Sequence, residues 1–389
     1  MIKSVKKPSI LVIYNSYLNK GGEDSVVHNE VQTLKKHNYH VLYKEYDNAA
    51  FKTFRLGSVF IPLNIFFNFS VFFNTFFFVK RNKIDVVHVH NVFYTVSPSV
   101  FWAAKLAGAK TIYTVHNYRL FCLNGLFFLN GQICTHCHDT NSFQKGVQNK
   151  CFKHSRLFSY VLATSTALHR TVGSWRLSVD QFMAINPFIA ELLAQKGIDR
   201  KKIYLKTNYS QDFGFKNYDN REDFYFFAGR LQAEKGVQHM VEGFKILKKK
   251  LLIAGNGELK EWVKENETGE INYIGHQSGE DMKKLYLKCK AVIFPSIWLE
   301  GMPMAIIEAQ SAGVIPIVAS TETTRAMISH QEDGFLYQAG NTESLVDTIL
   351  AFELMTAEEL NTISTNARQK FMDDYNEEQH IRVIEKIYN

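Results

Sequence analysis

Two glutamates eight positions apart, Glu300 and Glu308, mark the stretch of sequence best suited to hold a sugar and a ribose. The apolar run 291–296 before them predicts a strand, and Pro303 followed by apolar residues at helical spacing predicts a helix. Glu300 then lies in the loop at the end of the strand, and Glu308 about two turns into the helix. The N–H groups of a helix start favour a phosphate. The arrangement suits a nucleotide-sugar, and the alternative is a pair of solvated glutamates.

Two cations stand about seventy residues earlier, just after another predicted strand. Arg230 and Lys235 follow Gly229, and the pattern over 237–250 predicts a helix. Arginine and lysine at the end of a strand can neutralise a diphosphate, and arginine can do so with two parallel hydrogen bonds. A further strand end carries Gly-Asn-Gly at 255–257, which by itself is more often an ordinary turn.

These three segments resemble the donor-binding half of a known enzyme family. Gly-Arg-Leu-x-x-Glu-Lys-Gly (229–236), Gly-x-Gly-x-Leu (255–259) and the Pro-Ser…Glu-Gly…Glu-Ala run (295–309) resemble the retaining glycosyltransferases of family four, which have the GT-B fold. The resemblance extends over nearly the whole chain. It implies a metal-independent hexosyltransferase that needs no cofactor for catalysis.

The resemblance also implies roles for particular residues. Arg230 and Lys235 would bind the donor diphosphate, Glu300 the donor sugar and Glu308 the ribose, with residues 274–277 against the base. The implied catalytic residues are Glu300, His116, Arg230 and Lys235. The implied donor-binding residues are Gly22, Gly229, Arg230, Lys235, Asn256, Gly257, His276, Glu300, Gly301, Met302, Pro303 and Glu308. Met302 departs from the aromatic residue often found at its position.

The first half of the chain offers further candidates. Gly21 and Gly22 precede a predicted helix and could let the chain approach a ligand closely, although an ordinary loop fits as well. His116 follows a predicted strand directly, and with Asn117 it matches a family position that contacts the donor sugar near the new bond. His90 and Asn91 end another strand. We expect His90, Asn91 and Asn117 on the acceptor side, against the alternative of structural side chains.

Strand-like and helix-like runs alternate along the chain, which predicts an α/β fold with parallel, doubly wound sheets. A single long helix is expected over 357–388. The expected strands cover 9–14, 41–43, 84–90 and 110–115 in the first half, and begin near Tyr225, Leu251, Ile271, Ala291 and Val314 in the second.

The polar stretch 208–223 reads as a linker between two Rossmann-like domains. We expect an acceptor-binding domain over 1–208, with a Cys-rich insert at 117–155, and a nucleotide-sugar-binding domain over 209–370. The resemblance implies that residues 371–389 return to the first domain. Ligands of such sheets bind beyond the carboxyl ends of the strands, so the expected active site is the cleft between the domains.

Length and charge are consistent with this interpretation. The 389 residues are enough for two domains, and the net charge of +7 suits an anionic substrate or an anionic membrane surface, although it can also serve solvation alone. The opening residues run directly into a predicted core strand without a signal peptide. We therefore expect a cytoplasmic enzyme, peripheral to the inner membrane.

Four of the five cysteines lie within thirty residues of one another. They could bind one structural zinc, because thiolates are preferred zinc ligands and two of them are spaced C-x-x-C. Two disulfides fit the count but not a reducing cytoplasm, and free packed thiols are the simplest alternative. The four candidate ligands are Cys122, Cys134, Cys137 and Cys151.

Residues 59–79 contain nine phenylalanines and are long enough to cross a bilayer. Polar interruptions and the position between two strands of one sheet argue against a span. On a helical wheel Asn64, Asn68 and Thr75 form a narrow polar face, and lysines and arginines flank the segment. We expect a helix on the membrane surface beside a lipid-linked acceptor, with an aromatic core helix as the alternative.

The sequence thus predicts a retaining transfer of a sugar from a UDP- or GDP-linked donor to a lipid-linked glycan, in the synthesis of a bacterial surface polysaccharide such as an O-antigen or lipopolysaccharide. One alternative is a GT-B phosphorylase or a nucleotide-sugar epimerase. Another is a non-enzymatic zinc-knuckle protein that binds nucleic acid, which would leave Arg230, Lys235, Glu300 and Glu308 without a purpose. We expect no nucleic-acid partner. The base, the sugar and the linkage stay open.

Overall fold

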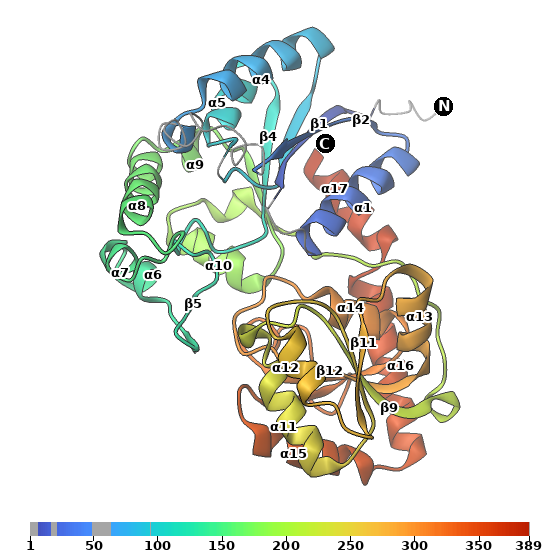
Figure 1. Cartoon of the computed structure of the whole chain (residues 1–389). Coiled ribbons are helices and arrows are strands. Elements are labelled where there is room, and N and C mark those ends of the chain that lie inside the picture. The colour runs from blue at the N-terminus through green and yellow to red at the C-terminus, as the bar shows by residue number, and fades with distance from the viewer. Residues whose placement is uncertain (1–6, 17–21, 49–63, 94, 389) are drawn as a thin grey trace, which may run out of the picture. The chain divides into compact units, whose positions relative to one another are not determined.

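The computed structural model describes residues 7–16, 22–48, 64–93 and 95–388 (Figure 1). The chain divides into two compact units. The first unit consists of Met1–Leu126, Thr135–Thr207 and Ile381–Asn389, and the second of Phe127–Cys134 and Asn208–His380. Each contains one six-stranded parallel sheet, so the α/β class with parallel sheets is confirmed.

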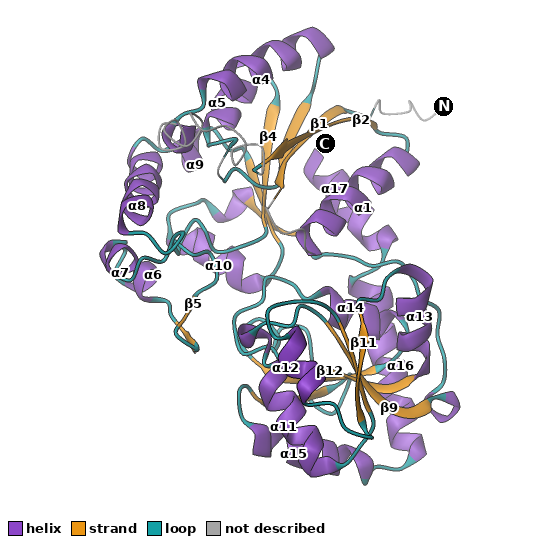
Figure 2. Cartoon of the chain, in the orientation of Figure 1, coloured by secondary structure: helices purple, strands orange, loops and turns teal. Residues whose placement is uncertain are grey.

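The sheet of the first unit has the order β2-β1-β3-β4-β7-β8. Its central strands are buried along almost their whole length because helices cover both faces, which are visible in Figure 2. The strands are β1 (Ser9–Ser16), β2 (His40–Asp47), β3 (Val86–Val89), β4 (Lys110–Val115), β7 (Gln181–Ala184) and β8 (Ile203–Leu205). The helices are α1 (Gly22–Lys36), α4 (Phe69–Asn82), α5 (Ser99–Leu106), α6 (His136–Asp139), α7 (Gln144–Gln148), α8 (Arg156–Thr171), α9 (Ser174–Leu177) and α10 (Pro187–Gln195).

The core of the first unit is completed by residues from the far end of the chain. Helix α17 (Glu377–Tyr388) lies beside α1 (Figure 1), and Ile384 and Ile387 are fully buried against Val27 and other apolar residues of that helix and of β1. Lys110 donates to the carbonyl oxygen of Ile387 at 2.6 Å, which fixes the end of α17 against β4.

The sheet of the second unit has the order β11-β10-β9-β12-β13-β14, with one core on each face. Its strands are β9 (Glu222–Ala228), β10 (Leu251–Ala254), β11 (Ile271–Gly275), β12 (Cys289–Phe294), β13 (Ile315–Ser320) and β14 (Phe335–Gln338). Its helices are α11 (Val237–Leu247), α12 (Lys260–Glu265), α13 (Gly279–Lys288), α14 (Met304–Ser311), α15 (Thr342–Glu353) and α16 (Ala357–Asp374). A short antiparallel hairpin, β5 (Phe128–Leu129) with β6 (Gln132–Ile133), also belongs to this unit.

In each sheet the strand order reverses once, and ligands of open parallel sheets bind at such a reversal. In the first unit the reversal lies between β1 and β3, and in the second between β9 and β12. The residues that follow β3, β9 and β12 therefore lie where a ligand is expected. They include His90, Arg230 and Glu300.

The single helix expected over 357–388 is wrong, because the chain forms two helices there. A capping box between Thr356 and Glu359 begins α16, which ends before Tyr375. Asn376 then accepts a hydrogen bond from the Gln379 N–H at 3.0 Å and so caps the start of α17. The interruption lets the second helix leave the second unit and enter the core of the first.

In the phenylalanine-rich segment, the face of the helix that is buried differs from the one expected. Residues 59–63 lie outside the described part of the chain. Asn68 caps α4, accepting from the Val71 N–H at 3.0 Å and donating to the Thr95 carbonyl oxygen at 2.6 Å. Asn68 and Thr75 are buried, so the predicted polar face is directed into the protein rather than toward water.

The aromatic rings of this segment lie on the outside instead. None of the eight phenylalanines between positions 64 and 79 is buried, so they are not the core residues of the alternative interpretation. Phe69, Phe73 and Phe77 are 67%, 52% and 63% exposed and follow one another at a spacing of four along α4. We call these three residues the phenylalanine ridge. No helix in the described part of the chain is long and apolar enough to cross a membrane.

Candidate active site

The loops after β9 and β12 are joined where the strand order of the second sheet reverses. The Ile297 N–H donates to the Glu234 carbonyl oxygen at 3.0 Å. Gly236 makes this approach feasible: its φ is +66°, and a Cβ atom there would lie 1.9 Å from the Pro295 carbonyl oxygen. Only glycine adopts this conformation at such close range without strain. Two segments sixty residues apart in sequence thus become one surface.

Lys235 and Glu300 meet on this surface. The Glu300 Oε1 atom accepts hydrogen bonds from Lys235 Nζ at 2.5 Å, from Ser296 Oγ at 2.6 Å and from Trp298 Nε1 at 2.8 Å. The Lys235 ammonium also lies over the Trp298 ring, 5.5 Å from its centroid. Glu300 is buried and Lys235 largely so, with a side chain 14% exposed, so the position of the carboxylate is firmly fixed.

Arg230 lies in the same loop but is exposed to solvent. The two cations predicted from the sequence therefore have different surroundings. Lys235 is paired with Glu300, whereas Arg230 extends from the end of β9. A cation with a free guanidinium at a strand end can turn toward an anion at little cost, because it has no ion pair to break in the described part of the chain.

The loop after β10 packs directly on the loop after β9. A Cβ atom on Gly255 would lie 1.8 Å from the Gly229 carbonyl oxygen, and the Leu231 N–H donates to the Asn256 carbonyl oxygen at 2.9 Å. Gly257 similarly faces the Leu231 carbonyl oxygen. These glycines bring the loops together, while the Asn256 side chain is exposed. His276, after the neighbouring strand β11, is also exposed.

Glu308 lies on α14, whose first turn follows the loop that carries Glu300. Desolvation raises the pKa of the Glu308 carboxyl to about 7, and the nearby Tyr286 hydroxyl opposes the rise. A carboxyl group with this pKa is only partly ionised at neutral pH. Hydroxyl donors such as those of a ribose would favour its ionised form.

Gly301, Met302 and Pro303 connect Glu300 to α14. Met302 is buried, and its sulfur accepts a hydrogen bond from the Asn208 N–H at 3.1 Å, while the Asn208 side chain donates to the Met302 carbonyl oxygen at 3.3 Å. Met302 therefore anchors the loop to the start of the second unit. Pro303 occupies the cap position of α14 rather than its first turn.

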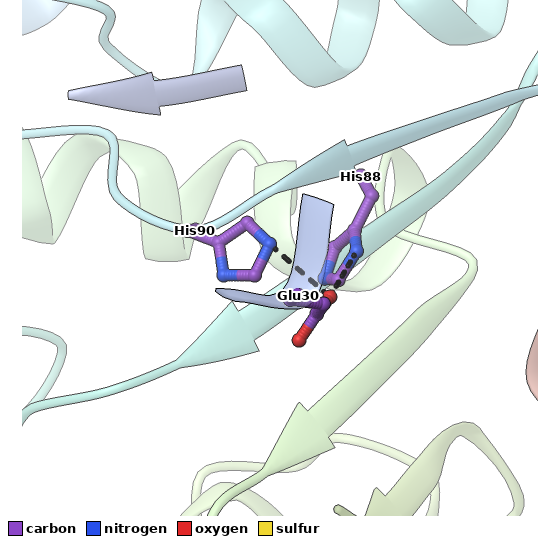
Figure 3. A group of neighbouring side chains, drawn as sticks. All are labelled: Glu30, His88 and His90. Carbon is purple, nitrogen blue, oxygen red and sulfur yellow. Dashed lines mark ion pairs between the residues drawn. The ribbon is translucent and has the colours of Figure 1, made fainter. Parts of the chain in front are cut away.

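In the first unit the structure joins His90 and His116 to an unpredicted group of charged residues. Glu30 of α1 lies between His88 and His90 (Figure 3): its Oε1 atom is 3.3 Å from His88 Nδ1 and 3.5 Å from His90 Nε2. The ammonium of Lys206 is bonded to the other carboxylate oxygen. His90 Nδ1 lies 2.9 Å from His116 Nε2. Glu30, His88, His90 and Lys206 are all at most 1% exposed.

The other predicted residues of the first unit have varied surroundings. The Asn91 side chain is buried, donating to the Asn15 carbonyl oxygen at 2.9 Å and accepting from the Phe93 N–H at 3.1 Å. His90 and Asn91 are each 1% exposed, and their place on the acceptor side stays a prediction. Asn117 is partly exposed. Gly22 begins α1 and is exposed, and Gly21 lies outside the described residues.

The four cysteines do not come together as the zinc hypothesis requires. Among the described residues, one group of at least three histidine, cysteine or acidic side chains has its ligating atoms within 4.8 Å of one another, and it is Glu30, His88 and His90. Cys122, Cys134, Cys137 and Cys151 form no disulfide. The looser outer spacings within the insert already differed from those of a zinc ribbon.

A cavity of about 580 Å³ lies between the Cys-rich insert and helices α8 and α10 of the first unit, and none of the predicted site residues lines it. Two cations that line it are hydrogen-bonded to backbone carbonyl oxygens. Arg170 is bonded to the Leu120 carbonyl oxygen at 2.5 Å, and Lys196 to the His138 carbonyl oxygen at 2.9 Å. Because the strand-end residues are held by specific contacts and match the expected position of a ligand, they are the better candidate site.

Sequence reasoning missed four residues of these two clusters. Ser296 and Trp298 alternate with Glu300 along the segment after β12, a spacing that could have indicated side chains on one side of an extended loop. Glu30 stands among Val27, Val31 and Leu34 on the apolar side of α1. A charged residue on a buried helix face predicts a buried partner, but nothing local identifies that partner as Lys206.

Two protein-family models match the chain in succession. The model described as "Glycosyltransferase Family 4" matches residues 20–206, and the one described as "Glycosyl transferases group 1" matches residues 209–370. An Escherichia coli protein named UDP-Gal:alpha-D-GlcNAc-diphosphoundecaprenol alpha-1,3-galactosyltransferase is 24% identical over 80% of this chain and 76% of its own length. A Campylobacter jejuni N,N'-diacetylbacillosaminyl-diphospho-undecaprenol alpha-1,3-N-acetylgalactosaminyltransferase is 25% identical over 43% of this chain and 50% of its own length.

Solved structures share the fold. The Anabaena protein Alr3699/HepE in complex with UDP matches with a TM-score of 0.66 at 14% identity, covering 97% of this chain and 99% of that one. The lipopolysaccharide outer core galactosyltransferase WaaB matches with a TM-score of 0.60 at 17% identity, again covering 97% and 99%. At these identities the likeness concerns the fold alone.

Proposed function

The chain belongs to the family-four glycosyltransferases, which are retaining, metal-independent enzymes of the GT-B fold, and from this we propose that it moves a sugar from a nucleoside diphosphate to a lipid-linked glycan. The observation that carries the proposal is the joined pair Lys235 and Glu300 at the reversal of the second sheet. There a cation for a diphosphate and a carboxylate for a sugar lie side by side.

The donor binds along the joined loops of the second unit. Arg230 and Lys235 neutralise the diphosphate and stabilise the charge that grows on it as the sugar leaves. Glu300 orients the hydroxyls of the donor sugar, and its three hydrogen-bond donors hold it in place for this task. Glu308 binds the ribose, and the segment around His276 lies against the base. Asn256, Gly257 and the start of α14 complete the donor contacts.

The catalytic contribution of the first unit comes from His116, which hydrogen-bonds a hydroxyl near the bond being formed. In a retaining transfer of this type the departing phosphate itself takes the proton of the acceptor hydroxyl, so no enzyme carboxylate acts as nucleophile. Asn117, partly exposed beside His116, contributes to acceptor binding. His90 contributes through His116 rather than by direct contact.

The acceptor is a glycan carried on a polyprenyl diphosphate. This part of the proposal is supported by the two relatives whose names specify undecaprenol-linked substrates. A Staphylococcus aureus relative named for capsular polysaccharide biosynthesis supports the same setting. We propose that the enzyme contributes to a bacterial surface polysaccharide, of which O-antigen and lipopolysaccharide are examples.

The enzyme works at the cytoplasmic face of the inner membrane, attached through the phenylalanine ridge. Large exposed aromatic side chains in a row are unusual on a soluble surface and suit an apolar phase. Lys80 and Arg81 in the last turn of α4 are exposed and can contact anionic headgroups. This geometry supports shallow insertion of one side of a helix.

A binding and transfer experiment tests the proposal. The purified protein is first screened by thermal shift with UDP-sugars and GDP-sugars, and then incubated with the stabilising donor and a synthetic polyprenyl-diphosphate glycan. We expect stabilisation by one nucleotide series and an α-linked product in the presence of EDTA. Stabilisation without transfer to any lipid-linked acceptor would contradict the assigned acceptor, and stabilisation by no nucleotide would contradict the donor site.

A further inference from the structure

The buried charged group around Glu30 is not explained by packing alone. Taking a carboxylate and an ammonium out of water costs several kcal/mol per ion, roughly, and is offset only by good geometry and further hydrogen bonds. Lys206 lies just beyond β8 and Glu30 in the middle of α1, and both are completely enclosed. The ammonium of Lys206 supplies the positive charge for Glu30, so the group forms an ion-pair network that has no need of a metal ion.

The three histidines attached to this network are neutral. Burial holds the pKa of His88 and of His116 well below the usual range for histidine, and it lowers that of His90 although Glu30 opposes the change. The positive charge of Lys206 acts in the same direction on all three. A neutral imidazole has one N–H donor and one acceptor nitrogen, and its partners decide which is which.

The contacts determine first the tautomer of His90 and then that of His116. His90 Nε2 faces the Glu30 Oε1 atom at 3.5 Å, where the attraction is electrostatic rather than a hydrogen bond. An N–H that faces an ionised carboxylate is favoured over a lone pair, so the His90 proton is on Nε2. His90 Nδ1 is then an acceptor. His116 Nε2, 2.9 Å away, must donate to it. The remaining nitrogen of His116, Nδ1, is left with a lone pair, and His116 is only partly covered by the protein.

We propose that Glu30 is a positioning residue that, through His90, makes His116 present Nδ1 as a hydrogen-bond acceptor to a hydroxyl group of the bound substrate. The inference rests on the proposed function, in which His116 touches a substrate hydroxyl. His116 thereby differs from the amide and ammonium donors elsewhere in the site, because it selects a hydroxyl that donates. The same arrangement rejects a group with no proton to give, such as an ether or a carboxylate.

The groups that face this network come from every element around it. His88 is bonded to the Tyr388 hydroxyl of α17 at 2.7 Å and to the Thr114 hydroxyl of β4 at 2.7 Å. Lys206 follows β8, and Glu30 belongs to α1. Among the three histidines, Tyr388 and Thr114 are hydrogen-bonded to His88, which separates this arm of the network from the arm that ends at His116.

The tautomers can be read directly by long-range ¹⁵N–¹H correlation on protein labelled at its 14 histidines, with His116 assigned from a His116→Gln sample. We expect the wild-type His116 signals of a neutral ring protonated at Nε2. A ring protonated at Nδ1, or a charged ring at neutral pH, would overturn the proposal. This measurement needs no substrate, so its outcome is independent of the donor and acceptor assigned above.

A variant tests the link to Glu30. Glu30→Met with Lys206→Met removes both charges together, because removing one alone would leave a buried ion unpaired and could prevent folding. We expect mixed His116 tautomers and about a tenfold or greater loss of kcat with the Kd for UDP unchanged. Tyr388→Phe is the control in the other arm, with wild-type tautomers and kcat. A double variant that keeps the Nε2-protonated His116 would refute the role of Glu30.

Activity separates the two proposals. If wild-type protein shows the expected tautomer but transfers no sugar with any donor, the proposed function fails while the protonation pattern stands. If transfer occurs and the double variant keeps wild-type kcat with mixed tautomers, the function stands and the role of His116 Nδ1 as acceptor fails.

Discussion

The ammonium group of Lys235 has two roles in the proposed reaction, because it is bonded to Glu300 and lies next to Glu234, whose carbonyl oxygen joins the loops after β9 and β12. Lys235→Ala removes the charge that stabilises the leaving diphosphate and one of the donors that fix Glu300. We expect turnover to fall about a hundredfold, which corresponds to roughly 3 kcal/mol of transition-state stabilisation. Steady-state kinetics of transfer measures the change.

Lys284→Ala is a suitable control for that experiment. Lys284 is an exposed lysine of the same unit, paired with Asp281 at 3.2 Å on α13, and its removal should leave turnover unchanged. Near-wild-type kinetics in a folded Lys235→Ala protein would show that the diphosphate is neutralised elsewhere.

The pKa of Glu308, raised to about 7 by burial, makes nucleotide binding depend on pH. Ribose hydroxyls donate to the ionised carboxylate, whose population increases about tenfold between roughly pH 6 and pH 8. We expect the affinity for UDP to rise by a similar factor and proton release to accompany binding in the acidic half of this range. Calorimetry in two buffers of different ionisation enthalpy measures both.

Glu308→Gln should remove this part of the pH dependence and leave only the part due to the phosphate of UDP itself. It should also affect stability with a defined sign. Because the folded-state pKa exceeds the usual value of 4.5, the folded protein binds the proton more tightly, and ionisation costs stability as the pH rises from about 4.5 to about 7, above which the loss is complete. The variant should therefore gain thermal stability over wild type above about pH 7, and an unchanged Tm there would contradict the raised pKa of Glu308.

At the scale of elements, the loop that joins β9 to α11 depends on Gly236. Gly236→Ala places a Cβ atom 1.9 Å from the Pro295 carbonyl oxygen at a φ of +66°. The left-handed conformation alone costs about 1 to 2 kcal/mol for alanine, and separating the loops would move Lys235 away from Glu300. We expect a lower Tm together with a loss of donor affinity.

Gly269→Ala provides the comparison, because a Cβ atom there meets nothing within 4 Å and the residue has no positive φ. It should preserve both Tm and affinity. Loss of Tm without loss of donor affinity in Gly236→Ala would mean that the alignment of the two loops is unimportant for the donor.

The phenylalanine ridge of α4 should govern membrane attachment. Replacing Phe69, Phe73 and Phe77 by serine removes about 1 kcal/mol or more of apolar transfer free energy per ring, so binding to anionic vesicles should weaken at least tenfold. Donor hydrolysis should be spared. Cosedimentation with anionic and neutral vesicles at low and high salt measures the effect, and attachment should be weaker for neutral vesicles and in high salt.

The control for the ridge is a pair of exposed leucines in the second unit. Leu350 and Leu354 are 48% and 86% exposed, so Leu350→Ser with Leu354→Ser removes exposed apolar surface elsewhere. This pair should leave vesicle binding intact. Equal loss of binding in both variants would assign the attachment to general surface hydrophobicity, and no binding by wild type would remove the membrane from the proposal.

The helices and strands that the sequence predicted were recognised from local patterns of apolar residues and from the donor-site motifs. Long β-branched runs such as the one around Ile10 to Tyr14 predict buried strands, and the motifs at 229–236 and 295–309 place the donor residues at strand ends. Strands β7 and β14 were missed because they contain no β-branched residue, and β8 because it has only three residues; β3 and β10 are as short as β7, but valine or isoleucine within an apolar run marks them. The break between α16 and α17 was missed because Asn376 acts as a cap only once the second helix has a core to enter.

The network of the first unit was beyond sequence reasoning for a different reason. Glu30 and Lys206 are separated by 176 positions, and His88 and Tyr388 by 300. No local spacing connects such residues, and only the order of the strands brings them together. His90 and His116 were recognised individually because each ends a strand, yet their mutual contact, 26 positions apart in sequence, depends on β3 and β4 being neighbours.

At the scale of the whole molecule, the first unit depends on residues of α17. Ile384 and Ile387 are fully buried, and Ile384→Ala should cost about 2 to 5 kcal/mol of the stability of that unit. Deleting residues 381–389 should do more and unfold it. Differential scanning calorimetry should show the transition of the first unit lost or shifted, with that of the second unit retained.

UDP supplies the internal check on this deletion. Because the nucleotide is proposed to bind the second unit, it should still raise the Tm of the remaining transition, which belongs to that unit. A deletion that leaves both transitions in place would show that α17 contributes nothing essential to the first core, contrary to its complete burial there.

The contribution of α17 to the first core also bears on how this protein matures during synthesis. Multidomain chains generally fold on the ribosome from the N-terminal domain onward. Here residues 22–207 emerge first but lack the apolar residues of α17, which leave the ribosome only after the whole second unit. The first unit is therefore synthesised first but completes its folding only after the second unit has been made. Its unfilled core and the phenylalanine ridge are exposed together in the nascent chain, so this half has the greater need of chaperones.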